Sequence, residues 1–451
     1  NYQGGCVKLN KSLYGLKQAS REWSACLHEV LTSKCHLQRS ELDPCLYYKM
    51  EGEKLVGIVI VYVDDILVGG TQSQVRDVSK RLQSQFRMTE NDVGHFLGIR
   101  VERAEDGTIL LTQDAYVDKL LNTFNMTDCA TRNTPAGGIL KPGPDLKEGD
   151  ERSQIPEYRR LLGALQYLSI TTRPDITFAV NQAARFCNRP TSDHLVAAKR
   201  ILRYLKATKH FGLKYEPMAS ANQKTVVAGH SSFRFNENGA KCSQQTSAAI
   251  KQDALRGFAD ADWATDTSDR KSQSGYVFMV YGGAVSWRSK KQPTIATSSC
   301  EAEIISLSMS MKEALWLRML MSELKLIDPE EPTKVFEDNQ GAKALVSDPK
   351  FSDRSKHIDI QFLRIREEIR EKKITVPYCA TKDMLADMFT KPLGPQLLYR
   401  NIQNMRMSMK GVTVGQTRDT GDGITAVVYK QHPFRAYRKW LGVCSLIEGA
   451  C

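Results

Sequence analysis

The stretch VGIVIVYVDDILV at residues 56–68 decides the fold of the N-terminal part of the chain. β-Branched residues dominate its first half, Asp64 and Asp65 interrupt it, and an apolar run resumes at 66–68 before a pair of glycines. β-Branched residues favour strands, whereas Asp and Gly favour turns. The stretch therefore predicts two apolar strands joined by a tight turn that carries both aspartates.

Alternating helix and strand patterns continue on the C-terminal side of this stretch and begin again near residue 255. Together they predict an α/β or α+β protein with more than one domain, as 451 residues at roughly 150 per domain also suggest. The expected helices are 74–86, 116–124, 157–170, 191–207, 300–325, 340–347, 358–371 and 382–390. The expected strands lie within 96–111 and at 255–260, 274–281, 284–288, 334–337 and 374–379. Residues 131–157 are a linker candidate, 216–253 are expected to form an insertion or flexible loop, and residues after about 394 show no sharp motif.

The chain carries 63 Lys and Arg against 51 Asp and Glu, and 41% of its residues are hydrophobic. This composition argues against wholesale disorder, and the net charge of +12 favours polyanionic partners, nucleic acid first and an anionic membrane face second. No stretch reaches the roughly 20 apolar residues of a membrane span, so no membrane partner is expected. Eleven cysteines without a pattern and the lack of a secretory signal predict a cytoplasmic or nuclear location. Because the first residue is Asn, we expect a fragment or processed piece of something longer.

Asp64 and Asp65 form the first candidate site. Adjacent carboxylates raise one another's pKa unless a cation neutralises them, and Mg²⁺ prefers such oxygen ligands. The apolar strands on both sides would bury the hairpin and hold its tip rigid, which favours a metal site. The alternative is an Asp-rich surface turn.

Four acids dispersed along the second α/β region form the other candidate site. Asp260 and Asp338 end predicted strands, while Glu303 and Asp387 lie in predicted helices. If the four converge, they could hold two Mg²⁺ ions roughly 4 Å apart around a phosphodiester. Each could instead be a solvated surface group. Glu301 has a structural explanation as part of a Ser-x-x-Glu capping box, so Glu303 is the preferred ligand.

Long motifs in this order resemble the reverse transcriptase and ribonuclease H of copia-type LTR retrotransposons. In the reverse transcriptase part they are KSLYGLKQASREW (11–23), VIVYVDDILVGG (59–70), HFLGIRV (95–101), YRRLLGALQYLSITTRPDITFAVNQAARF (158–186) and HLVAAKRILRYLKAT (194–208). In the ribonuclease H part they are GFADADWATDTSDRKSQSGYVFM (257–279), SWRSKKQPTIATSSCEAEIISLS (286–308), EDNQGAKAL (337–345), SKHIDI (355–360) and KDMLADMFTKPL (382–393).

The resemblance implies a segment of a Pol polyprotein. Its expected parts are a truncated reverse transcriptase palm at 1–130, a thumb and connection at 131–255, a ribonuclease H-like mixed-sheet domain at 256–393, and a tail of unknown role at 394–451. The expected partners are RNA–DNA hybrids, template–primer duplexes and other Pol or Gag segments, and the expected location is a cytoplasmic virus-like particle or the nucleus.

The resemblance also implies roles for particular residues. Asp64 and Asp65 match the family's YVDD pair at the polymerase metal site. The four dispersed acids match the ribonuclease H set with its two Mg²⁺ ions; Asp262 is a neighbour that could be confused with Asp260 and is otherwise a solvated turn residue. His357 lies in the KHID motif, where it contacts substrate or has a structural role.

Two basic segments are candidates for nucleic-acid binding. The first contains Lys17, Gln18 and Arg21, which match a motif near the incoming nucleotide and template; the alternative is a helix-capping loop packed by Tyr14 and Trp23. The second is one face of the predicted helix 191–207, where basic side chains would contact phosphates without sequence preference. Its alternative is a solvated helix face. The residues of this face are Lys199, Arg203 and Lys206.

One departure from the family decides the expected activity. A third polymerase carboxylate belongs to an earlier motif resembling DVxxAFL, which this sequence does not contain. We therefore expect Mg²⁺-dependent cleavage of the RNA strand of hybrids without reverse transcription. The alternative is an inactive nucleic-acid-binding relic, and a working reverse transcriptase would require upstream residues.

Overall fold

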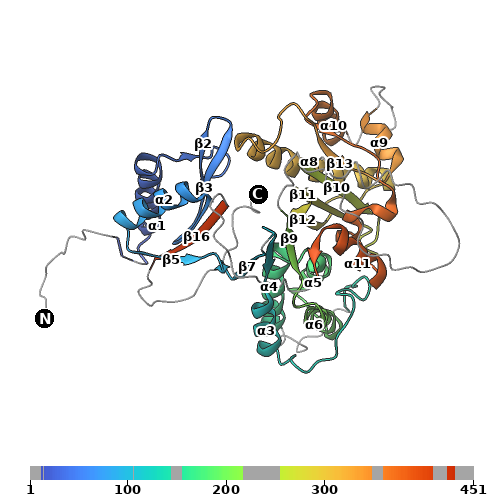
Figure 1. Cartoon of the computed structure of the whole chain (residues 1–451). Helices are drawn as coiled ribbons and strands as arrows, with labels where there is room; N and C mark the ends of the chain where they lie inside the picture. The colour runs from blue at the N-terminus through green and yellow to red at the C-terminus, as the bar shows by residue number, and fades with distance from the viewer. Residues whose placement is uncertain are drawn as a thin grey trace, which may run out of the picture. The chain divides into compact units, whose positions relative to one another are not determined.

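The computed structural model describes residues 12–13, 15–104, 106–143, 155–216, 254–347, 359–409 and 424–431. The chain divides into two compact units, which Figure 1 labels by element. Unit 1 comprises residues 1–101, 319–326 and 418–451, and unit 2 comprises 102–318 and 327–417. Each unit therefore draws on both early and late parts of the sequence.

Unit 1 is built on an antiparallel six-stranded sheet in the order β1-β2-β3-β4-β16-β5. The predicted hairpin is confirmed as β3 and β4, with Tyr62 paired to Asp65 across the turn. Gly70 permits the close approach of the two strands, because a Cβ there would lie 2.3 Å from the carbonyl oxygen of Val56. The strands are β1 (Gln38–Arg39), β2 (Leu46–Glu51), β3 (Lys54–Tyr62), β4 (Asp65–Thr71), β5 (Met88–Asp92) and β16 (Ile424–Gln431).

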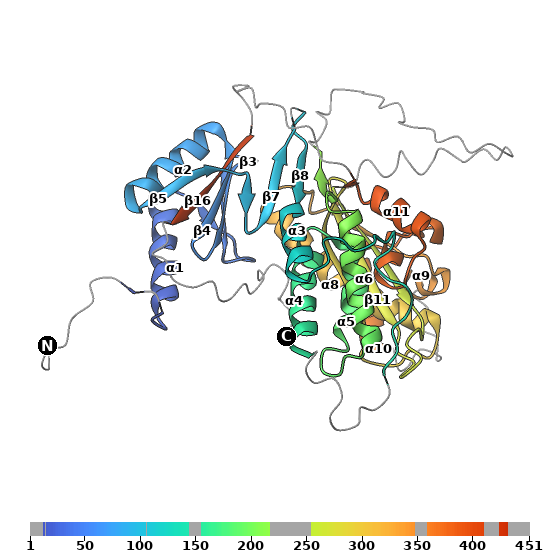
Figure 2. The same cartoon turned by 90° about the horizontal axis from the view of Figure 1, so that it is seen from below.

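Two helices, α1 (Ala19–Glu29) and α2 (Gln72–Gln85), bury their apolar stripes against this sheet (Figure 2). A single turn of π-helix at Val30–Lys34 extends α1. The hydroxyl of Thr71 caps α2 by accepting from the backbone N–H of Gln74 at 3.4 Å. Leu27 from α1 and Leu82 from α2 lie in the same core as strand residues of β2, β3 and β4. The predicted helix 74–86 is thus confirmed, with its start two residues earlier.

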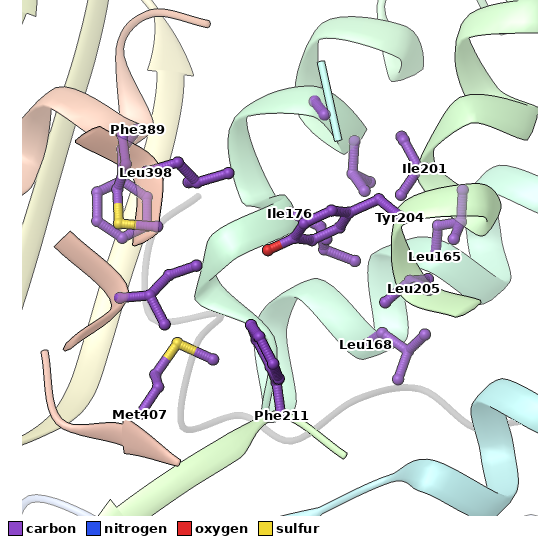
Figure 3. Packing of buried hydrophobic residues seen from close by; sticks show 14 of the residues in the cluster. Leu165, Leu168, Ile176, Ile201, Tyr204, Leu205, Phe211, Phe389, Leu398 and Met407 are labelled. Atoms are coloured by element: carbon purple, nitrogen blue, oxygen red, sulfur yellow. The ribbon is translucent and has the colours of Figure 1, made fainter. Parts of the chain in front are cut away.

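Unit 2 contains a helical part whose core Figure 3 shows from close by. Its helices are α3 (Asp114–Thr123), α4 (Ile155–Thr171), α5 (Thr177–Ala184), α6 (Ser192–Ala207) and α11 (Pro395–Asn404). Leu398 of α11 and Met407 of the short strand β15 (Met407–Ser408) share this core with α4 and α6. β15 pairs with β9 (Gly212–Tyr215), which in turn pairs with β8 (Ile109–Thr112); β6 (His95–Phe96) and β7 (Ile99–Arg103) precede them in the chain. Residues just after 394 are therefore part of the fold.

A buried ion pair ties the helical part together. The guanidinium of Arg173 donates to both carboxylate oxygens of Asp175 at 2.9 and 2.7 Å, and the hydroxyl of Tyr204 donates to the same carboxylate at 2.8 Å. Both charged side chains are almost fully buried. The motif that contains Arg173 and Asp175 thus has a structural role here.

The second sheet of unit 2 has five strands in the order β12-β11-β10-β13-β14. β10, β11 and β12 are antiparallel neighbours, whereas β13 and β14 run parallel to β10. The strands are β10 (Leu255–Asp262), β11 (Gln273–Val280), β12 (Gly283–Lys291), β13 (Thr333–Phe336) and β14 (Ile374–Thr375), and the helices that follow or separate them are α8 (Ser299–Glu323), α9 (Gln340–Ser347) and α10 (Asp359–Arg370). The predicted mixed sheet is confirmed.

Candidate active site

Asp260 lies on β10, the central strand of the five-stranded sheet, and is 3% exposed. The parallel register pairs Phe258 of β10 with Phe336 of β13. Two residues beyond each phenylalanine stand Asp260 and Asp338. Because parallel strands advance together, this register brings the two aspartates to the same level of the sheet.

The N-terminal turn of α8 positions Glu303. The Glu301 backbone N–H donates to the hydroxyl of Ser298 at 3.1 Å, and the Glu301 carboxylate accepts from the Thr297 backbone N–H at 2.6 Å. Glu301 is thus used in capping, as predicted from the sequence. Glu303 is 5% exposed, and one turn further the Ser306 hydroxyl donates to the carbonyl oxygen of Asp260 at 2.7 Å, which holds α8 over β10.

Asp387 is carried by a 3-10 helix, Leu385–Phe389, which follows another at Thr381–Asp383. The prediction of one continuous helix at 382–390 is wrong, because Met384 adopts an extended backbone that separates the two turns. Gly275, paired with Asp260 on β11, lets this segment approach the sheet; a Cβ there would lie 2.7 Å from the Cβ of Phe389.

The four predicted acids converge in two overlapping groups. Asp260, Asp338 and Asp387 offer oxygens that all lie within 4.8 Å of one another, and so do Glu303, Glu337 and Asp338. Asp338 belongs to both groups, so the arrangement provides two adjacent places for a cation. Asp262 lies two residues beyond Asp260 on the same face of β10, but it belongs to neither group.

Glu337 was missed from the sequence, although it is fully buried within this cluster. Its backbone continues the sheet beyond β13, since Glu337 N–H donates to Pro377 and its carbonyl accepts from Cys379. Strand alternation would send adjacent residues to opposite faces. The available signal was Glu337 itself, the first acid of the EDNQ motif, immediately before Asp338.

Burial and mutual repulsion shape the electrostatics of the cluster. Burial, with contributions from Asp387 and Asp338, raises the pKa of Asp260 to about 7, although Lys391 opposes the rise. Burial is also the main reason that the pKa of Glu303 and that of Glu337 are well above their usual values. Without a cation, burial therefore disfavours the ionised form of these carboxyls.

Two basic or hydroxylic neighbours act on the cluster from residues 390 and 391. The ammonium of Lys391 lies 2.8 Å from an Asp387 oxygen and 3.9 Å from an Asp260 oxygen. The Thr390 hydroxyl donates to the carboxylate of Asp260. Lys391 partly neutralises the site, and Thr390 fixes the orientation of Asp260.

The donor set fits a hard divalent cation. One oxygen of Glu303 and one of Glu337 are buried without a hydrogen-bond partner, which is costly unless a cation completes their coordination. All the ligands are carboxylates, as Mg²⁺ prefers.

The hairpin tip in unit 1 differs from this cluster. Asp64 and Asp65 are half-buried, and the tip is held by Val63 in the left-handed region (φ +52°), whose carbonyl accepts from the indole N–H of Trp23 at 2.7 Å. Among the described residues, no group of three metal-ligating side chains includes either aspartate. The backbone of the turn therefore fixes the tip. Within the described ranges, its two aspartates are not part of a larger group of metal-ligating side chains.

The predicted nucleic-acid-binding residues lie on surfaces with different properties. Lys17, Gln18 and Arg21 are exposed at the start of α1, and Gln18 makes no side-chain capping bond. On α6, Arg203 and Lys206 donate to the carbonyls of Ala130 (2.5 Å) and Cys129 (2.8 Å), so they hold a loop in place.

The remaining predictions concern Lys199, His357, the insertion at 216–253 and the absence of a membrane span. Lys199 on α6 is half-buried. His357 lies outside the described residues, as does nearly all of the predicted insertion at 216–253. Within the described parts of the chain, no helix has the length and apolarity needed to cross a bilayer.

The sequence of this chain is similar to those of known proteins over most of its length. A family model described as reverse transcriptase (RNA-dependent DNA polymerase) matches residues 1–137. The chain is 34% identical over 394 residues to the retrovirus-related Pol polyprotein from transposon TNT 1-94 of Nicotiana tabacum, which covers 85% of this chain and 27% of that protein. It is 35% identical over 391 residues to the retrovirus-related Pol polyprotein from transposon RE1 of Arabidopsis thaliana. This match covers 86% of this chain and 24% of that protein.

The chain belongs to the family of retrovirus-related Pol polyproteins from copia-type transposons. It spans about a quarter of the length of these relatives. A foamy viral protease-reverse transcriptase in complex with RNA/DNA hybrid is similar over 82% of this chain and 39% of that chain, with 14% identity and a TM-score of 0.40. Ribonuclease H1 from Halobacterium salinarum is similar over 30% of this chain and 93% of that chain, with 13% identity and a TM-score of 0.22.

Proposed function

We propose that this chain is a Mg²⁺-dependent endonuclease that hydrolyses the RNA strand of RNA–DNA hybrids. The observation that carries the proposal is the burial of Asp260 in one cluster with acids from three other segments. A cluster that raises the pKa of its own members is unfavourable for folding, so its presence indicates a catalytic or metal-binding purpose.

Asp260, Asp338 and Asp387 would hold one ion, and Glu303, Glu337 and Asp338 would hold the other. When bound, Mg²⁺ supplies Lewis acidity toward a phosphate and neutralises the carboxylates. The chain's own residues prepare this place: Thr390 orients Asp260, and Ser306 fixes the backbone beneath it. The ammonium of Lys391 would leave Asp387 when a divalent ion enters, since both occupy the same carboxylate.

The decisive test is cleavage of a labelled RNA–DNA hybrid by the parent chain and by Asp338→Asn. We expect Mg²⁺-dependent products from the parent and none from the variant. Asp262→Asn is the matched control, because it removes a neighbouring charge outside the cluster and should cut like the parent. Equal cutting by the parent and Asp338→Asn would refute the proposal. Salt-sensitive retention of the hybrid without any products would instead support the inactive relic.

We further propose that this chain does not perform reverse transcription. The support is the composition of the hairpin tip, where Asp64 and Asp65 are not joined by a third acid among the described residues. Primer extension on an RNA template by the purified chain should give no product above background. Hybrids and template–primer duplexes would be its nucleic-acid partners, with other Pol or Gag segments in a cytoplasmic virus-like particle or the nucleus.

A further inference from the structure

The sheet of unit 1 is completed by a strand from near the C-terminal end of the sequence. β16 lies between β4 and β5 and is antiparallel to both (Figure 2). Its register runs from Ile424 opposite Thr71 to Lys430 opposite Asp65 on one side, and from Val427 opposite Asp92 to Gln431 opposite Met88 on the other. β16 is therefore a central strand, hydrogen-bonded along both edges.

Among the described strands, β5 joins this sheet only through β16, because β5 is the last strand in the order and β16 is its neighbour. If β16 were withdrawn, β4 and β5 would each present an unpaired edge inside the unit. Unpaired backbone donors and acceptors are unfavourable when buried and bind other strands when exposed. The gap between β4 and β5 is thus shaped to accept one antiparallel strand.

The side chains of β16 fit a central position. Val428 and Tyr429 are both fully buried, although they point to opposite faces of the strand. Tyr429 packs in the core with residues of α2, and its hydroxyl donates to a carboxylate oxygen of Glu90 on β5 at 2.8 Å. Ala426, two residues before Val428, is exposed. The strand is therefore anchored by its middle residues.

We propose that unit 1 contains a strand-binding slot between β4 and β5, and that residues 424–431 of the same chain are its occupant. The slot takes an antiparallel strand of about eight residues with apolar side chains at its centre. Residues 424–431 contain neither Asp nor Glu, and their register places Lys430 opposite Asp65. The occupant consequently brings no third carboxylate to the strand beside the Asp64–Asp65 tip.

The test uses the full chain with a specific protease site inserted within residues 410–423. After cleavage, the C-terminal piece should remain bound through size-exclusion chromatography under native conditions. Val428→Asp should release it, because the charge would have to be buried. Ala426→Asp is the matched control in the same strand and should leave the piece bound, because this position is exposed. Release of the parent piece, retention of the Val428→Asp piece, or an exchanged dimer as the intact species would each overturn the proposal.

Hydrogen exchange shows whether the effect belongs to the slot. In cleaved Val428→Asp, amides of β4 and β5 should lose at least tenfold protection, while those of β10 and β11 in unit 2 should keep theirs. A synthetic peptide of residues 422–433 should restore protection to β4 and β5, and the same peptide with Val428→Asp should not. Failure of the parent peptide to restore protection would mean that the variant had misfolded unit 1 without emptying a slot, and would overturn the proposal.

Discussion

The hairpin tip of unit 1 and the acid cluster of unit 2 use the same residue type in different surroundings. Asp64 and Asp65 are adjacent in sequence, half-buried and fixed by the backbone of a tight turn. The cluster assembles acids from β10, α8, the end of β13 and a 3-10 helix, and buries most of them. Two acids that are adjacent in the sequence are close together in any fold. Acids from distant segments come together only when several helices and strands position them. We conclude that the second arrangement is the stronger indication of chemistry.

The largest expected effect separates the two acidic sites directly. Asp260→Asn should lower hybrid cleavage at least about 100-fold, because even a group that only supports a metal ligand typically contributes 10–100-fold. The double variant Asp64→Asn with Asp65→Asn should cleave within about twofold of the parent. Initial rates with saturating Mg²⁺ and one labelled hybrid give both values. A large loss in the double variant would mean that the hairpin tip takes part in cleavage, so the acid cluster of unit 2 would not be the only acidic site that cleavage needs.

The contrast can be sharpened by the glycine that allows the cluster to close. Gly275→Ala places a Cβ where the Phe389 Cβ and the Thr390 side chain already lie, so the Asp387 segment must move away from Asp260. We expect unit 2 to lose about 1–3 kcal/mol of stability, as overpacking usually causes. Denaturant unfolding measures this free energy, and the cleavage assay should show a parallel loss.

Gly163→Ala on α4 is the matched control for Gly275→Ala, because nothing lies within 4 Å of its Cβ. Alanine in the interior of a helix favours folding by roughly 0.5–1 kcal/mol over glycine, so this variant should be as stable as the parent or more so. If both variants behaved alike, the close approach of the 3-10 helix to β11 would not be what assembles the site.

Local patterns were sufficient for one kind of structure and insufficient for another. The β3–β4 hairpin and the strands of the mixed sheet were predictable, because each is encoded by a short apolar run and a turn. The partner of β4 was not, since β16 is joined to it by pairing across most of the chain, and residues 424–431 carry no motif that marks their destination. The same holds for α11 and β15, which enter the core of unit 2 from a region without a sharp sequence signal.

At the acid cluster, sequence reasoning identified four ligands but neither their surroundings nor the fifth acid. Asp260, Glu303, Asp338 and Asp387 stood out through family motifs. Glu337 did not, because adjacent residues of a strand are expected to point to opposite faces, so only one acid of the Glu337–Asp338 pair was expected at the site. Lys391 could not be predicted as a neighbour of Asp260 either, since their ion pair depends on how the 3-10 helix packs against β11.

The last expected effect concerns pH and the stability of the cluster without metal. In chelator, the pKa of Asp260 is raised from 3.8 to about 7 in the folded protein, chiefly by burial. Between about pH 4 and 7 the folded state therefore holds a proton that the unfolded state has lost, so the free energy of unfolding falls as pH rises, by about 1.4 kcal/mol per pH unit for one such carboxyl. Thermal unfolding at pH 5 and pH 8 should show this fall in the parent.

Asp260→Asn supplies the reference for that measurement, because an amide resembles the protonated acid at every pH. The variant and the parent should have similar stability at pH 5, and the variant should be the more stable at pH 8. Added Mg²⁺ should stabilise the parent at pH 8 and have little effect on the variant, since an ion that binds the folded state favours it by mass action. A parent that gains stability over Asp260→Asn as pH rises in chelator would show that the cluster is relieved by something other than a divalent ion. The expected ranking of stabilities instead means that the metal-free acid cluster destabilises the folded protein, and that a bound divalent ion offsets this destabilisation.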